Sequence, residues 1–187
     1  FLPKKHNHLE FIFDKIKMVY NDPRRFGFFL ILKDQNSFKK YFFKLGPEPI
    51  SKNFDIKYIK KYLKNKNRNI KNILLDQKFV SGLGNIYVNE ILFYSKINPL
   101  KAGCKLKHKE IKNLIKFSKK TIINAIKKGG SSIQNFTNTS GIKGYFQNSF
   151  KVYNQDERKC PNLYCDGTIK KLFISNRSTF FCKKCQK

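Results

Sequence analysis

The sequence contains no tryptophan, a single methionine and only 12 acidic residues in a chain of 187. Long apolar runs are also lacking. The longest, Phe26–Leu32, is far shorter than the roughly 20 residues that a membrane-spanning helix requires. The chain does not open with the charged and then apolar pattern of a secretory signal. These absences argue against a membrane-embedded or secreted protein, and we therefore expect a cytoplasmic one.

Acidic residues are scarce relative to basic ones, and this imbalance dominates the composition. Lysine and arginine together number 40, which gives a formal net charge of +28. Such an excess favours a polyanionic partner, with nucleic acid the first candidate and an anionic membrane surface the second. A hydrophobic content of 40% and an aromatic content of 15% argue against disorder. We therefore expect a folded, basic protein.

Arginine is the scarce basic residue, with five against 35 lysines. Lysine and asparagine are abundant in the way that drift toward AT-rich codons would produce, so part of the charge carries no information about binding. Lysine serves where a point charge is sufficient, and a retained arginine indicates a need for its planar fork of donors. The arginines are therefore informative positions: Arg24, Arg25, Arg68, Arg158 and Arg177.

The first part of the chain has the alternation of a β-sheet. Leu9, Phe11 and Phe13 recur at period two, which predicts a strand with one buried face. Pro47 and Pro49 end this region, because proline is excluded from helix interiors and central strands, and we place a domain boundary there. Between these points we predict antiparallel strands over residues 8–13, 17–20, 26–32 and 41–45.

Helical periodicity replaces alternation after the prolines. Apolar residues recur at helical spacing in three short segments that begin near residues 56, 70 and 86, and in a longer one, 109–128. The longest ends at Gly129-Gly130, a typical helix stop. Residues 131–158 are polar and contain glycine, which predicts a mobile loop. Strands followed by helices predict an α+β fold.

The tail of the chain carries a four-cysteine pattern. Cys160 and Cys165 form C-x4-C, and Cys182 and Cys185 form C-x2-C sixteen residues further on. Two such knuckles can present four thiolates to one structural Zn²⁺ ion, with a hairpin of residues 168–173 and 178–181 between them. Two disulfides are the alternative, which a reducing cytosol disfavours. Cys104 stands apart, and we interpret it as a buried or idle thiol.

Two turns and a strand carry candidate ligand-binding residues. The turn Gly82-Leu83-Gly84-Asn85 precedes a helix and could bind an anion there, although most such turns are only tight turns; nearby Lys66, Arg68 and Lys71 favour phosphate. The loop Asp22–Gly27 is either a hairpin turn with Phe26 in the core or a DNA wedge. His6 and His8 share one strand face without a third metal ligand, which favours a phosphate contact.

These motifs together resemble one protein family. Asp22–Gly27 (DPRRFG), Leu45–Pro49 (LGPEP), Ile70–Tyr87, the Gly141–Phe146 segment ending in GYF and the four-cysteine tail occur in the order typical of bacterial formamidopyrimidine-DNA glycosylases. The related endonuclease VIII branch lacks the DPRRFG loop. The resemblance implies the end of a β-sandwich catalytic domain at 1–46, a helix–two-turns–helix DNA-binding domain at 47–153 and a zinc finger at 154–187.

The resemblance implies a function in base excision repair. Members of this family remove oxidised purines, such as 8-oxoguanine and formamidopyrimidines, from damaged double-stranded DNA. They flip the nucleotide out of the stack, attack its sugar with an N-terminal proline, and cut the strand by β,δ-elimination, an AP lyase activity. The expected protein is a monomer in the bacterial cytoplasm, associated with the nucleoid through DNA and without a membrane partner.

Individual site residues follow from the same resemblance. Arg24 and Phe26 match the pair that fills the void left by the flipped nucleotide, and Arg177 matches the proton donor for δ-elimination. The four tail cysteines match the zinc ligands. The remaining expected DNA contacts are His6, Lys66, Lys71 and Asn85.

Two departures from the family pattern affect these expectations. The first knuckle of the family is usually C-x2-C, whereas this chain has C-x4-C between Cys160 and Cys165. The family begins with Pro-Glu, whereas Pro3 is internal here. We therefore expect the nucleophile to lie outside this chain and the chain alone to be inactive. The alternatives are a non-catalytic, zinc-stabilised duplex-binding module and a basic RNA-binding protein.

Overall fold

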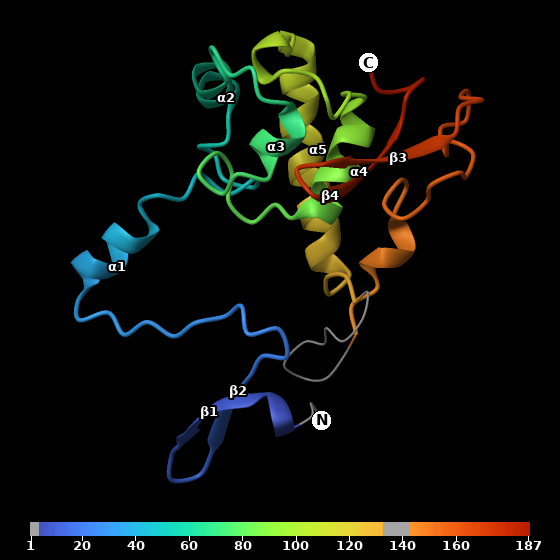
Figure 1. The fold of residues 1–187 in the computed structure, drawn as a ribbon. Helices are drawn as coiled ribbons and strands as arrows, with labels where there is room; N and C mark the ends of the chain where they lie inside the picture. Colours follow the sequence, from blue (N-terminus) through green and yellow to red (C-terminus); the bar gives the residue numbers. More distant parts are fainter. Residues whose placement is uncertain (1–3, 133–142) are drawn as a thin grey trace. The chain divides into compact units, whose positions relative to one another are not determined.

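A computed structural model describes residues 4–132 and 143–187, drawn in Figure 1. Packing divides the chain into two units, Phe1–Phe43 and Lys44–Lys187. The described elements are helices and two separate two-stranded antiparallel sheets, which confirms the α+β class. In the described part of the chain, no helix combines the length and apolarity that crossing a membrane would need. The domain limits at residues 46 and 153 stay predictions.

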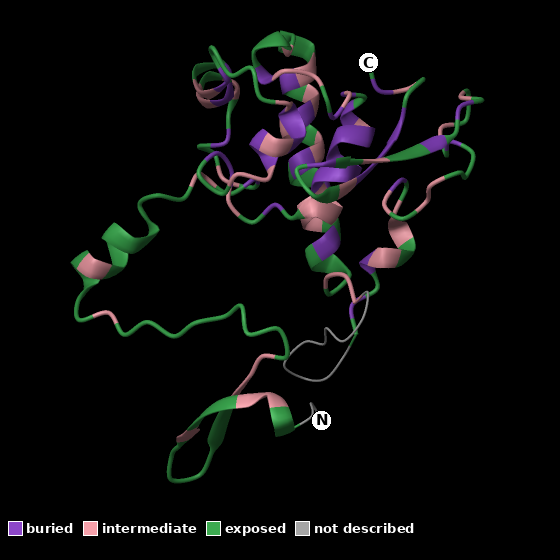
Figure 2. Cartoon of the chain, viewed as in Figure 1, coloured by how far each residue is buried: buried purple, intermediate pink, exposed green. Residues whose placement is uncertain are grey.

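From residue 4 onward, the N-terminal unit has one β-hairpin and one α-helix. Lys4–His6 (η1) forms a 3-10 turn that leads into strand β1, Asn7–Ile12, and β1 pairs with β2, Lys17–Asn21. Helix α1, Gln35–Phe42, follows. None of the described residues of this unit is buried (Figure 2). The hairpin confirms the first two predicted strands.

Two of the predicted strands in this unit are wrong. Residues 26–32 form neither strand nor helix, because no described strand pairs with this apolar run. Residues 41–45 overlap helix α1. Asp34 caps that helix by accepting the Ser37 N–H at 2.7 Å, and Phe38 and Phe42 pack one turn apart with ring centroids 4.7 Å apart. Capping and an i,i+4 aromatic pair thus override the expected strand.

The described residues of the C-terminal unit include four α-helices. They are α2, Ile56–Leu63; α3, Ile70–Leu74; α4, Asn85–Ser95; and α5, His108–Lys127, with a 3-10 turn, η2, at Gly103–Lys105. Predicted helical periodicity is confirmed in all four. The buried apolar residues of the core come from α2, α3, α4, α5 and the loop before α4, and they include Ile59, Leu74, Phe79, Val88, Ile91 and Leu114.

The tail packs on these helices as a second hairpin. Strand β3, Ile169–Ile174, pairs with β4, Arg177–Cys182, which confirms the predicted hairpin. Ser175 and Asn176 both have positive φ, 48° and 58°, as a two-residue hairpin turn requires. Strand β4 lies against α4 (Figure 1). This packing brings the start of β4 close to the helical unit.

The segment predicted as a mobile loop, residues 131–158, is described in part. Residues 133–142, which include the start of the Gly141–Phe146 motif, lie outside the described residues. Beyond them, Phe146–Ser149 (η3) forms a 3-10 turn, and Phe146 and Val152 are buried. The buried Glu90 carboxylate of α4 accepts three backbone N–H groups, from residues 151, 152 and 153. Residues 143–158 thus form a loop with one 3-10 turn, and a buried acid holds part of its backbone; the predicted mobility stays a prediction.

Candidate nucleic-acid interface and metal centre

Four cysteine sulfurs lie together in the tail. Cys160, Cys165, Cys182 and Cys185 place their Sγ atoms within 4.8 Å of one another. The Cys160–Cys185 and Cys165–Cys182 sulfurs are 3.6 Å and 3.7 Å apart, whereas a disulfide needs about 2.05 Å. Thiolates about 2.3 Å from one tetrahedral ion would lie about 3.8 Å from each other. The two-disulfide alternative is therefore wrong in this structure, and the four cysteines can bind one metal ion.

The long first knuckle does not disturb this arrangement. Leu163 and Tyr164 of the C-x4-C segment have exposed fractions of 94% and 101%, so the added length projects into solvent. Asn162 turns back and donates its Nδ2–H to Cys185 Sγ at 3.0 Å. The departure from C-x2-C thus changes the surface of the knuckle and leaves its sulfurs in place.

Gly167 closes the metal centre from one side. A Cβ at this position would lie 2.9 Å from Cys182 Sγ and 3.3 Å from Cys165 Sγ. The Gly167 N–H donates to Cys165 Sγ, and this hydrogen bond lowers the pKa of the Cys165 thiol. Burial raises the pKa of the Cys160 thiol. A side chain at residue 167 would push a ligand sulfur out of position.

Three predicted site residues from separate parts of the sequence meet at the tip of the tail hairpin. Lys71 of α3 donates its Nζ–H to the Ser178 carbonyl at 2.9 Å. Asn85, the first residue of α4, donates its Nδ2–H to the same carbonyl at 3.0 Å. Arg177 precedes Ser178 and is exposed. This arrangement places two cationic side chains near the start of one helix.

The start of α4 adds backbone donors to this cluster. Its N-cap, Gly84, is extended and offers no side-chain cap, and a Cβ there would meet nothing within 4 Å. The first N–H groups of a helix lack intrahelical acceptors, and together with the helix dipole they favour an anion. The predicted Gly-x-Gly helix start is therefore present, with the positive φ of 81° at Gly82 that glycine tolerates.

The predicted lysines differ in exposure. Lys66 is exposed, and its Nζ lies 5.5 Å from the centroid of the Tyr62 ring. Lys71 is 0% exposed. Burial, and secondly the neighbouring Arg177 guanidinium, lower the pKa of Lys71 to about 8. Direct phosphate contacts by either lysine stay predictions, and the burial of Lys71 gives it a role inside the protein as well.

Asp22 organises the loop that carries Arg24 and Phe26. Its carboxylate accepts the Arg24 N–H at 3.0 Å, the Gly27 N–H at 2.8 Å and the Tyr20 hydroxyl at 3.0 Å. The bond from Gly27 is the main reason that the pKa of Asp22 falls to about 2. Phe26 is 76% exposed, and the Arg24 guanidinium carbon lies 4.6 Å from its ring centroid. The core interpretation of Phe26 is therefore wrong in this structure.

The histidines face the same loop from β1 and η1. His8 Nε2 donates to the Asp22 carbonyl at 2.9 Å, and the His6 carbonyl accepts the Asp22 N–H at 3.0 Å. Among the described residues, neither histidine belongs to a group that could hold a metal. Cys104 is exposed, so its interpretation as a buried thiol is wrong. The DNA contact of His6 stays a prediction.

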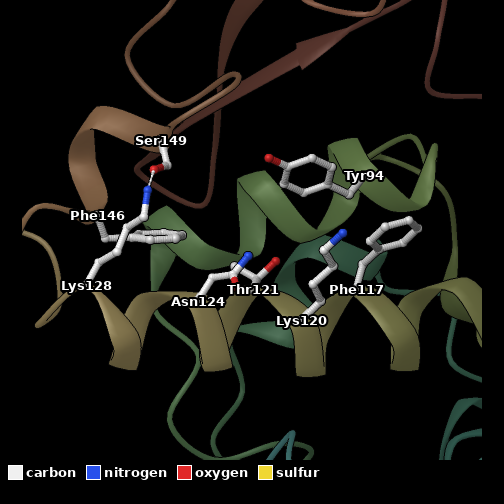
Figure 3. Close-up of a pocket in the computed structure, with 8 residues that line it drawn as sticks. All are labelled: Tyr94, Phe117, Lys120, Thr121, Asn124, Lys128, Phe146 and Ser149. Atoms are coloured by element: carbon white, nitrogen blue, oxygen red, sulfur yellow. Dashed lines mark hydrogen bonds between the residues drawn. The ribbon is translucent and has the colours of Figure 1, made fainter.

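A cavity of about 220 Å³ lies elsewhere, between α4, α5 and η3 (Figure 3). Tyr94, Phe117 and Phe146 form its aromatic walls, and the Lys128 Nζ at its edge donates to the Ser149 hydroxyl. None of the predicted site residues lines it. The chemistry expected of this chain is therefore not located in this cavity.

Comparison with known proteins agrees with these observations. A family model described as the formamidopyrimidine-DNA glycosylase H2TH domain matches residues 45–137. The formamidopyrimidine-DNA glycosylase of Rickettsia bellii is 42% identical over 185 residues, which cover 98% of this chain and 67% of the relative. That of Roseobacter denitrificans is 38% identical over 187 residues, covering 99% of this chain and 66% of the relative.

Solved structures give the same result. The Lactococcus lactis Fpg in complex with abasic-site DNA superimposes with a TM-score of 0.90 at 36% identity, covering 100% of this chain and 68% of that one. The Thermus thermophilus MutM (Fpg) protein gives 0.87 at 29% identity, covering 99% and 70%. The chain belongs to the formamidopyrimidine-DNA glycosylase family. It spans about two thirds of the length of its curated relatives.

Sequence reasoning missed several residues that build the site of this family member. Thr179 accepts from Lys71, Asn89 accepts the Phe180 N–H, and Asn72 donates to the Ser175 hydroxyl. Asn89 could have been found, because it is a polar residue on a fully buried part of α4, four positions after Asn85. Thr179 and Asn72 carry no comparable signal, since their partners lie more than 100 residues away.

Proposed function

We propose that this chain binds damaged double-stranded DNA as part of a base-excision DNA glycosylase. The observation that carries the proposal is the meeting of Lys71, Asn85 and Arg177 at the start of α4. The exposed Arg177 and the N-terminus of α4, with the buried Lys71 ammonium behind them, supply the charge and donors that a backbone phosphate requires. Related Lactococcus lactis Fpg structures are complexes with abasic-site and Fapy-dG DNA, which supports the same partner.

The chemistry proposed for the whole protein is removal of oxidised purines followed by AP lyase cleavage through β,δ-elimination. Arg177 is the residue of this chain that would act in the second elimination. A guanidinium is a poor proton donor because it stays protonated in proteins. Its main contribution would be a bidentate contact that stabilises charge on the departing phosphate. His6, Arg24 and Phe26 would contact the strand and fill the space left by the flipped nucleotide.

We propose Zn²⁺ as the ion for the four-cysteine centre. Four thiolates in a tetrahedral arrangement suit Zn²⁺ over harder cations that prefer oxygen ligands. The donor set is closed, with no open position for substrate, so the ion would be structural. It would supply folding energy to the hairpin that carries Arg177. We expect one ion per monomer.

Salt-dependent DNA binding tests the proposal. The chain should bind a duplex that contains an abasic-site analogue, and each phosphate contact should contribute a slope of about −0.9 in log affinity against log salt. Five contacts would lose roughly two to three decades between about 50 and 200 mM salt. A flat response, or preference for single-stranded RNA over the duplex, would contradict duplex binding. The latter result would favour the RNA-binding alternative.

Borohydride trapping separates the enzymatic from the non-catalytic reading of this chain. A Schiff base between protein and abasic DNA becomes a stable adduct on reduction. Binding without an adduct would assign phosphate and lesion recognition to residues 1–187 and the nucleophile to another polypeptide segment. An adduct would locate a nucleophilic amine within residues 1–187, and peptide mapping would identify it.

A further inference from the structure

Lys71 is a buried lysine with no acidic partner in the described part of the chain. It is 0% exposed, and no ion pair recorded among the described residues includes it. Its Nζ donates to the Ser178 carbonyl at 2.9 Å and to the Thr179 hydroxyl oxygen at 2.6 Å. Burying an ammonium with neutral acceptors alone is costly, and the pKa of Lys71 falls to about 8. An apolar residue would avoid this cost, so the hydrogen bonds themselves require an explanation.

These hydrogen bonds lead directly to Arg177. The Thr179 hydroxyl, which accepts from Lys71, donates to the Arg177 carbonyl at 3.2 Å. The Ser178 carbonyl, the other acceptor of Lys71, also accepts from Asn85 at 3.0 Å, so both of its lone pairs are used. The carbonyls on both sides of the Arg177–Ser178 junction are thereby fixed by side chains.

Helices α3 and α4 hold the rest of the hairpin tip in the same way. Asn72, next to Lys71, donates to the Ser175 hydroxyl at 2.8 Å. Asn89 accepts the Phe180 N–H at 2.8 Å. The exposed Arg177 thus stands on a backbone that is restrained before and after it, although the hairpin turn itself is at the surface.

We propose that Lys71 is a positioning residue that orients Arg177 toward a DNA phosphate through the Ser178 and Thr179 hydrogen bonds. This inference rests on the proposed function and deepens it. Lys71 then acts through Arg177 and makes no phosphate contact of its own. A bidentate contact forms only when the guanidinium faces the phosphate in a fixed direction. A small displacement of the guanidinium would therefore weaken the contact.

A double-mutant cycle distinguishes positioning from direct contact. Lys71→Met keeps an apolar chain of similar length and removes the donor. We expect it to weaken binding to the abasic-analogue duplex about tenfold in the wild-type background, and less than about twofold when Arg177→Ala is already present, because coupled residues are non-additive. Equal losses in the two backgrounds would overturn the proposal and make Lys71 an independent contact.

Lys66→Met is the matched comparison for this cycle. Lys66 is exposed, lies five positions before Lys71, and places its Nζ 5.5 Å from the centroid of the Tyr62 ring. If Lys66 contacts phosphate directly, Lys66→Met should weaken duplex binding by the same factor with and without Arg177→Ala. Thr179→Val provides a second variant in which Lys71 keeps its charge but the link to the Arg177 carbonyl is removed. We expect it to be non-additive with Arg177→Ala; additivity would count against the proposal.

Amide hydrogen exchange gives a readout that does not need DNA. In the metal-loaded chain, Lys71→Met should speed exchange at residues 177–179, whereas Lys66→Met should leave it unchanged. Unchanged exchange in Lys71→Met would overturn the inference. If the wild-type chain fails to bind the duplex, the proposed function fails, and the exchange measurement still decides whether Lys71 orders the backbone around Arg177.

Discussion

Asn89 and Phe180 join the helical core to the metal-binding hairpin through one buried hydrogen bond. The Asn89 Oδ1 accepts the Phe180 N–H at 2.8 Å, while the Asn89 Nδ2–H donates to the Asn85 carbonyl at 2.6 Å. Asn89 is 1% exposed. One carboxamide therefore links the start of α4, which we propose as a phosphate site, to the strand that begins with Arg177.

Replacing Asn89 should destabilise the C-terminal unit. Asn89→Ala leaves the Phe180 N–H buried without an acceptor, which costs about 1–3 kcal/mol. Urea unfolding of the metal-loaded chain would measure this loss. Asn53→Ala is the control, because Asn53 is an exposed turn residue whose substitution should change stability by less than about 0.5 kcal/mol. Equal stability of the two variants would contradict the linking role of Asn89.

Gly167→Ala should weaken metal binding while leaving the ligand set intact. Its Cβ would lie 2.9 Å from Cys182 Sγ, closer than packed atoms allow, so a ligand must move. We expect the Gly167→Ala chain to release its ion to a chromogenic chelator faster than the unsubstituted chain does. Gly84→Ala is the control for metal release, since its Cβ would meet nothing within 4 Å. Identical release rates in the two variants would show that the sulfur positions are not restrained there.

Removing the metal should unfold the tail. The buried cluster of the tail includes the proposed ligands Cys160 and Cys182 beside Ile169 and Phe180, so the ion is expected to supply much of the folding energy of the hairpin. Elemental analysis should find one zinc per chain, and Cys182→Ser should abolish this binding and the protection of β3 and β4 amides. A native-like hairpin in the chelated or Cys182→Ser protein would contradict a structural role for the ion.

Asp22 should titrate well below the ordinary range. Hydrogen bonds, chiefly from the Gly27 N–H, lower its pKa from 3.8 to about 2. The stabilisation of the loop by ionised Asp22 is therefore complete above about pH 4 and lost as the pH falls toward 2. Carboxyl NMR titration would measure the pKa. Tyr20→Phe removes one donor to Asp22 and should raise the pKa toward 3.8; no change would exclude this contact.

Phe26→Ala should affect lesion binding more than stability. The Phe26 side chain is 76% exposed, so its removal should change the free energy of unfolding little. The proposed wedge offsets unstacking in kinked DNA, which costs a few kcal/mol per step. Affinity for an abasic-analogue duplex should therefore fall more than affinity for undamaged duplex. Phe43 is an exposed phenylalanine outside the loop, and Phe43→Ala should not lower the affinity for one duplex more than for the other. Equal losses on both duplexes would reject the wedge.

Local patterns in the sequence determined much of this protein. Periodicity of 3.6 placed α2 to α5, because each helix turns one apolar stripe toward the core. Cysteine spacing located the metal centre and the hairpin between its knuckles. The order of the motifs was sufficient to indicate the family, because turn glycines, prolines and cysteines reflect requirements of the local backbone and of the four-cysteine centre. The strands expected at 26–32 and 41–45 failed because strand formation depends on a partner, and Asp34 supplied a helix cap instead.

Only the tertiary structure decided what the site residues do together. Ser178 lies 107 positions after Lys71 and 93 positions after Asn85, and no periodic pattern relates residues that far apart. From the sequence, Lys71 and Lys66 both look like surface charges. Packing of β4 against α4 buried Lys71 beneath the hairpin and left Lys66 exposed. The difference arises because burial and hydrogen-bond partners are properties of how distant elements pack, which local spacing does not encode.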